Sequence, residues 1–345
     1  MARIGENELK AQIKNREFSN VYMIYGEETY LKDFYVSKLK DSLVDSEFAD
    51  FNFHQYDGKD TNISQILMDS QTLPMMSEYS LVIVRDYPLD KSSADLKVLD
   101  EFFSDIPETT ILVFWYDTIQ IDTKKSGKWK TIENMFSKAG SSVNLEKRTE
   151  GELVKLIVSS AKRRGCSIDS ASARYLISVV GTDIKTIFNE LEKICGYVGN
   201  GDITRDIIDR IAVKCLQARV YDLSKFIIAG NSDGAYGVLN VLFAQKEEPV
   251  AVLSVISSCY IDMYRAKCAK SANVNESELS GYFQYKGREF LIRNASRDCR
   301  NISFKNLRQA IDVLCKTDEL LKSTAIDKNL LLEEAVAKLL LLRGQ

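Results

Sequence analysis

The chain has 345 residues, of which 45% are hydrophobic and 28% are charged, a balance typical of a folded globular protein. Its formal net charge of −3 excludes a general attraction to nucleic acid, so any DNA contact requires a local basic patch. The single histidine, His54, excludes triads with a histidine base and metal sites built from several histidines. We expect His54 to be structural.

The sequence shows no targeting or membrane-spanning segment. Its first residues are polar, and no apolar run is long enough to cross a bilayer. The seven cysteines are spread along the chain without a C-x-x-C pair. We therefore expect reduced thiols in a cytoplasmic protein that has no metal site and no contact with a membrane.

In residues 1–145, helical and strand-like patterns alternate. Helices are expected over residues 6–17, 31–43, 63–70, 94–103 and 128–137. Strands are expected over residues 21–25, 52–56, 80–86, 110–116 and 142–144. Several of these strands are apolar throughout, as in a parallel sheet covered on both faces. This part is therefore predicted to be an α/β domain.

The strand-like pattern stops after about residue 146, and the rest of the chain is predicted to be helical. A small unit over residues 146–213 is expected to hold helices 150–164, 170–180, 184–197 and 206–211. A third domain over residues 214–345 is expected to hold helices 220–230, 233–245, 249–270, 287–297, 303–323 and 328–342.

Residues 26–33, Gly-Glu-Glu-Thr-Tyr-Leu-Lys-Asp, have the spacing of a phosphate-binding loop after strand 21–25. Gly26 and Lys32 keep the first glycine and the lysine of that motif. Leu31 replaces the second glycine and obstructs the close approach of phosphates, while Asp33 replaces the hydroxyl that binds Mg²⁺. We interpret this segment as a degenerate nucleotide loop; the alternative is an ordinary turn into an acidic helix start.

Asp117 follows the predicted strand 110–116. An active ATPase of this class usually carries two adjacent acids at such a position, and here the pair is Asp117-Thr118. We interpret Asp117 as a turn residue or a helix N-cap. The basic run 124–130 is interpreted as a solvated loop whose Trp129 packs inward, the alternative being a base-stacking site.

Leu73, Pro74, Met75 and Met76 form an apolar run where a helix gives way to a strand. Such a run is either buried under the sheet edge or exposed as a contact for a partner. Leu73 is compatible with both positions, whereas Met75 and Met76 are expected to be exposed, because methionine is common on binding surfaces. The four arginines of the segment 288–300 either pair with acids of neighbouring subunits or are solvated.

The chain resembles the delta subunit of the bacterial DNA polymerase III clamp loader over essentially its whole length. The most specific pieces are VYMIYGEETYL at 21–31 and SQTLPMMSEYSLVIVR at 70–85. A third, GTDIKTIFNELEK at 181–193, is typical of the family's lid domain. The resemblance implies a P-loop-like (AAA+-like) α/β domain over 1–145, a helical lid over 146–213 and an all-α collar over 214–345.

The resemblance also implies a function: a non-catalytic subunit of the DNA polymerase III holoenzyme, without a cofactor, that binds and opens the sliding clamp for loading onto primed DNA. Leu73, Pro74, Met75 and Met76 are the implied contacts with the clamp, the beta subunit. The other implied partners are the tau/gamma motor subunits, delta-prime and DNA within the assembled complex. The family's usual plug ends in Phe or Leu, so which of the two methionines inserts deepest is open.

Two other functions are considered. An ATP-hydrolysing AAA+ motor subunit requires Gly-Lys-Ser/Thr at residues 31–33, where this chain has Leu-Lys-Asp. A delta-prime-like scaffold subunit typically has zinc-binding cysteines and a Ser-Arg-Cys motif, and this sequence has neither.

Overall fold

The computed structural model describes residues 3–275, 278–283, 285 and 288–342. The chain divides into two compact units, residues 1–147 and 148–345, which are described separately below. The division of the second unit into a lid and a collar at residue 213 stays a prediction. Residue 287, the predicted start of one helix, and both ends of the chain lie outside the described residues.

The first unit is built on a six-stranded sheet in which every pairing is parallel, in the order β1-β6-β2-β5-β4-β3. Its strands are β1 (Arg3–Ile4), β2 (Val21–Tyr25), β3 (Phe53–Asp57), β4 (Ser80–Arg85), β5 (Thr110–Trp115) and β6 (Ser141–Asn144). The AAA+-like α/β fold predicted from the sequence is confirmed. Strand β1 was not predicted, since two residues are too few to show a periodic pattern.

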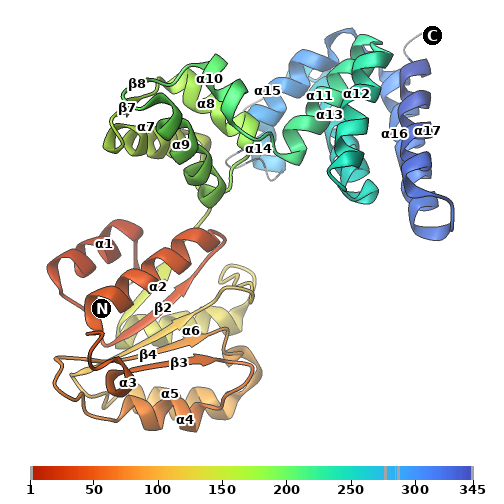
Figure 1. Cartoon of the computed structure of the whole chain (residues 1–345). Helices are drawn as coiled ribbons and strands as arrows, with labels where there is room; N and C mark the ends of the chain where they lie inside the picture. Colours follow the sequence, from red (N-terminus) through yellow and green to blue (C-terminus); the bar gives the residue numbers. More distant parts are fainter. Residues whose placement is uncertain (1–2, 276–277, 284, 286–287, 343–345) are drawn as a thin grey trace. The chain divides into compact units, whose positions relative to one another are not determined.

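Helices cover both faces of this sheet (Figure 1). They are α1 (Glu6–Asn15), α2 (Thr29–Leu43), α3 (Ala49–Asn52), α4 (Ile63–Ser70), α5 (Ser93–Phe103) and α6 (Gly127–Ala139). One core lies between the sheet and the helices α4, α5 and α6, where Met23, Val84 and Phe114 are fully buried. Helices α1 and α2 lie on the other face, so the central strands are buried on both sides, as their continuous apolar sequences require.

The second unit begins with four helices, α7 (Glu150–Arg163), α8 (Ser170–Val180), α9 (Ile184–Val198) and α10 (Arg205–Ile211). Helix α7 starts with a capping box, in which Thr149 and Glu152 each bond the other's backbone amide. The expectation that strands stop after residue 146 is wrong. Strands β7 (Cys166–Ser167) and β8 (Gly201–Asp202) form a short parallel pair, again too short for a periodic pattern.

The remaining helices are α11 (Leu216–Ala229), α12 (Ser232–Ala244), α13 (Pro249–Ser271), α14 (Leu279–Tyr282), α15 (Glu289–Asp298), α16 (Phe304–Ser323) and α17 (Lys328–Leu341). All of them except α14 contribute to one core, while Leu279 of α14 packs in a separate small cluster with Ala269, Tyr285 and Ile292. Leu239, Ile256 and Leu332 are fully buried in that core. Among the described residues, no helix combines the length and the apolar character needed to cross a membrane.

Two arginines of α15 pair with acids of the same chain. Arg293 lies 2.8 Å from both carboxylate oxygens of Glu150, and Arg297 lies 2.9 Å from Asp298. Both arginine side chains remain more than half exposed, at 53% and 55%, so the solvated alternative considered from the sequence fits them alongside these pairs within the chain. Glu150 is buried in the first turn of α7, so its bridge to Arg293 ties the start of this unit to α15.

Candidate functional site

The loop after β2 folds back onto the chain itself. Gly26 has φ +126°, and a Cβ atom there would lie 2.3 Å from the carbonyl oxygen of Leu145, so no other residue fits this position without displacing backbone. The amide of Glu28 donates to the same carbonyl at 2.9 Å. At least one amide that a phosphate-binding loop would turn toward its ligand is thus bonded within the protein.

Two residues at the end of the degenerate loop also face inward. Leu31 and Lys32 are buried in the first turn of α2, whereas Asp33 is exposed. The ammonium of Lys32 donates to the carbonyl of Tyr116 at 2.7 Å and lies 3.4 Å from that of Asp117. Burial lowers the pKa of Lys32, and the nearby carboxylates, led by Asp117, oppose that shift. The residues present therefore do not fit a nucleoside triphosphate.

Asp86, which the sequence analysis did not select, organises the neighbouring bend. Its buried carboxylate accepts bonds from the amides of residues 117–119 and from the hydroxyl of Thr118. Burial raises the pKa of Asp86, but these hydrogen bonds outweigh that effect and hold the pKa below its ordinary value. Asp117 lies in this bend and forms an ion pair with Arg85. Helix α6 is capped by Ser126, so of the two alternatives considered for Asp117 the turn residue is confirmed and the N-cap is not.

The tryptophan of the basic run 124–130 packs inward, as expected from the sequence. Trp129 is only 5% exposed and meets the ring of Tyr116 edge-on, with the centroids 5.2 Å apart. Its indole is therefore part of the core between α6 and the sheet. The interpretation of Trp129 as an inward-packed residue is confirmed, and a role in base stacking is excluded by its burial.

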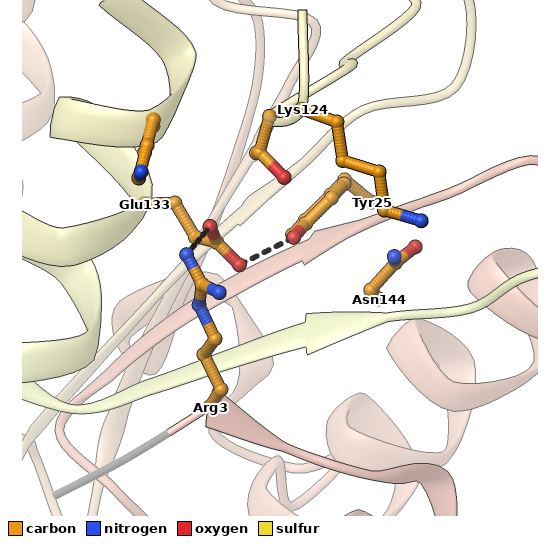
Figure 2. Close-up of a pocket in the computed structure, with 7 residues that line it drawn as sticks. Arg3, Tyr25, Lys124, Glu133 and Asn144 are labelled. Carbon is orange, nitrogen blue, oxygen red and sulfur yellow. Dashed lines mark hydrogen bonds and ion pairs between the residues drawn. The ribbon is translucent and has the colours of Figure 1, made fainter. Parts of the chain in front are cut away.

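A cavity of about 430 Å³ lies beside this run, at the carboxyl ends of β2 and β6. Figure 2 shows Arg3 and Tyr25 pointing at the carboxylate of Glu133 from α6. Tyr25 donates to Glu133 at 2.5 Å, and Arg3 forms an ion pair with the same group. The buried acid is thus occupied in holding α6 to β1 and β2.

The apolar run 73–76 lies at the amino ends of the parallel strands, opposite the end at which the loop 26–33 lies. It belongs to the loop between α4 and β4, so it precedes the amino end of a strand, whereas the loop 26–33 follows the carboxyl end of one. Leu73, Met75 and Met76 are 74%, 51% and 78% exposed, and Pro74 is half-buried. The expected exposure of Met75 and Met76 is confirmed, and Leu73 is exposed rather than buried under the sheet edge.

This apolar tip, Leu73–Met76, has a defined backbone. The buried side chain of Asn52, at the end of α3, donates to the carbonyl of Met75 at 2.7 Å and accepts from its amide at 2.6 Å. Met76 adopts a left-handed conformation with φ +54°, which is uncommon for a residue other than glycine. Asn52 could not be selected from the sequence, because a side chain that bonds backbone 23 residues away leaves no local pattern.

Models of one known protein family match parts of both units. The family model described as DNA polymerase III, delta subunit, matches residues 22–139, and the model of the C-terminal domain of the same subunit matches residues 217–339. The chain belongs to the DNA polymerase III delta-subunit family. This delta-family chain is 26% identical over 336 residues to DNA polymerase III subunit delta of Bacillus subtilis (strain 168), and the match covers 95% of each chain.

A second relative is the probable DNA polymerase III subunit delta of Aquifex aeolicus (strain VF5), which is 20% identical over 316 residues, with 86% of each chain covered. Among solved structures, the Bacillus subtilis DNA clamp loader delta protein matches with a TM-score of 0.63 and 24% identity. That match covers 97% of this chain and 99% of the other. The delta-family fold therefore extends over both units.

Proposed function

We propose that this delta-family chain binds the sliding clamp of its replication machinery through the apolar tip Leu73–Met76 and holds the clamp ring open for loading onto primed DNA. The observation that carries the proposal is the exposure of three large apolar side chains on one backbone fixed by Asn52. Exposed apolar groups gain nothing from folding, whereas in a partner's pocket they act as anchors. Methionine side chains adapt readily to such a pocket.

The proposed mechanism is differential binding. If the tip binds an opened or weakened clamp interface more tightly than the closed ring, binding shifts the population of rings toward the open form. The chain would supply no hydrolysis, because its loop 26–33 is occupied by its own Leu145, Leu31 and Lys32. ATP turnover would then belong to the motor subunits of the same complex.

The proposal includes the other parts of the chain. Residues 146–213 would act as the lid and residues 214–345 as the collar that joins the tau/gamma motor subunits and delta-prime, with DNA held inside the assembled complex in the cytoplasm. Exposed leucines on α17 support a collar role: Leu330 and Leu341 are 58% and 73% exposed beside the buried Leu331 and Leu332. Such leucines fit a helix that has a further partner.

The test is the double variant Met75→Asp/Met76→Asp, measured for binding to the clamp of the same organism. A charge placed in an apolar pocket should weaken binding by ~2–4 kcal/mol, or on the order of 30- to 1000-fold. The matched control is Phe34→Asp, because Phe34 is a part-exposed apolar residue of α2 on the other face of the sheet. Unchanged binding of the double variant, with an unchanged melting temperature, would refute the tip as the contact.

A further inference from the structure

Exposed large apolar side chains of the first unit gather at one end. In the described part of residues 1–147 there are seven of them, of which Phe34 and Val98 lie elsewhere. The other five lie on α3, α4 and the loop that follows α4: Phe51, Met68, Leu73, Met75 and Met76. Phe51 and Met68 are 55% and 66% exposed and are not part of the apolar tip.

Both residues are joined to the tip by short structural links. Phe51 immediately precedes Asn52, whose side chain holds the backbone of Met75. Met68 lies in the last turn of α4, and its carbonyl accepts from the amide of Gln71 at 3.2 Å, just before Leu73. Phe51 thus lies on the helix whose Asn52 holds the tip, and Met68 lies on the helix that precedes the tip in the chain.

Packing within the unit does not explain these two side chains. Helix α4 buries Ile63, Ile66 and Leu67 against the sheet, and Met68 lies outside that buried face. Five exposed large apolar side chains on segments that are linked by hydrogen bonds are of the kind that marks an interaction site. A surface with a central anchor and apolar neighbours is also the usual anatomy of a protein interface.

The border of this surface is acidic. Asp50 adjoins Phe51 and is exposed, and Glu78 follows the tip, where its only described ion pair is an exposed one with Arg16 at 3.6 Å. Because Glu78 already has a cationic neighbour, a partner that fits this surface presents an apolar depression with a basic side chain at the rim opposite Asp50.

We propose that Phe51 and Met68 form a second contact with the sliding clamp, beside the pocket that receives Met75 and Met76. This inference rests on the proposed function. It adds a second contact area, Phe51 and Met68, to the one formed by the apolar tip. Because Asn52 fixes the tip relative to α3, both contacts reach the clamp as one rigid unit. The second contact would fix the orientation of the ring on this chain, which a single point of contact cannot do.

The experiment uses the full chain with Phe51→Ser and Met68→Ser, separately and together, and measures clamp affinity and melting temperature. Each change should weaken binding ~5- to 20-fold with little change in melting temperature. Phe34→Ser is the matched control and should leave affinity unchanged. If Met75→Asp/Met76→Asp abolishes binding while the serine variants bind like the original chain, the tip stands and the second contact is refuted. If none of these variants changes binding, or the original chain does not bind, the proposed function fails together with the inference.

A photo-crosslinking residue placed at position 51 or 68 gives a second measurement that does not depend on losing an interaction. Both positions should crosslink to the clamp, and position 34 should not. Absence of crosslinks at both positions in a chain that still binds the clamp would refute the second contact. Asp50→Lys should weaken binding several-fold at low salt and less at high salt, because surface charges are screened. Equal affinity at low salt would refute the basic rim.

Discussion

Asn52 holds the backbone of Met75 by two hydrogen bonds, one donated by its amide group and one accepted by its carbonyl oxygen. These two hydrogen bonds satisfy the amide and the carbonyl of Met75 as a neighbouring strand would, although Met75 lies in a loop. Since Asn52 is 1% exposed and joins directly to the edge strand β3, it transmits the rigidity of the sheet to the tip. The tip is thus ordered before any partner arrives, which reduces the entropy lost on binding.

Replacing Asn52 by Asp should loosen the tip. A carboxylate still accepts from the amide of Met75 but repels its carbonyl, so stability should fall by ~1–3 kcal/mol and clamp affinity by roughly tenfold. Asn231→Asp is the control, because Asn231 caps α12 only as an acceptor and an aspartate keeps that bond. Equal clamp affinity of Asn52→Asp and the original chain would show that the tip needs no such support.

A fragment of residues 1–147 should fold and bind the clamp without the rest of the chain. These residues form a compact unit that contains the whole sheet, both of its helix layers and the tip. The same fragment should not join the motor subunits, because α11–α17 are absent. Circular dichroism, clamp binding and size-exclusion chromatography with the motor subunits check the three parts. Entry of the fragment into the complex would contradict the collar role.

The chain should not bind ATP. The ammonium of Lys32 is bonded to the carbonyl of Tyr116, and the amide of Glu28 is bonded to the carbonyl of Leu145. The buried side chain of Leu31 stands where the motif has a glycine. Calorimetry with Mg·ATP should show no saturable heat at millimolar nucleotide. A dissociation constant in the micromolar range would mean that the loop opens and releases these bonds.

Asp86→Asn should destabilise the fragment 1–147 in a pH-dependent way. The amide that replaces one carboxylate oxygen cannot accept the bonds from the bend, so we expect a loss of ~1–3 kcal/mol at neutral pH. The folded-state pKa of Asp86 lies below its unfolded value, so its contribution is present above roughly pH 4 and is lost as the pH falls through the folded pKa.

Urea unfolding at several pH values between 7 and 3 measures this difference. The gap between the original fragment and Asp86→Asn should shrink as the pH falls below about 4. Asp122→Asn is the control, because Asp122 is an exposed acid that accepts from the amides of Lys124 and Lys125. A gap that stays constant down to pH 3 would mean that Asp86 does not act through its charge.

The sequence was a good guide wherever a pattern was long and local. The buried strands β2, β4 and β5 each contain a continuous run of at least four apolar residues, and the amphipathic helices begin and end within a few residues of the predicted limits. The exposure of Met75 and Met76 was predicted from their place between a helix and a strand and from the frequency of methionine on binding surfaces. Strands β1, β7 and β8 were not predicted, because a strand of two residues shows no periodic pattern.

Contacts between distant parts of the chain could not be predicted. Asn52 meets Met75, Arg3 meets Glu133 and Arg293 meets Glu150, across separations of 23, 130 and 143 residues. Each pairing depends on which strand or helix lies beside which, and polar residue types alone do not specify it. Asp86 is an intermediate case, since an acid at the carboxyl end of a buried strand is a recognisable signal, although its partners in the bend after β5 are not.

The engagement of Lys32 with the carbonyl of Tyr116 has an evolutionary consequence. Changing Leu31 to Gly and Asp33 to Ser would restore the letters of a phosphate-binding motif, but Lys32 would still be turned inward and Glu28 would still be bonded to Leu145. Several substitutions on separate segments would have to occur together before any of them was useful. The loss of this pocket is therefore entrenched, and a descendant of this chain is more readily reshaped at its exposed tip than returned to nucleotide chemistry.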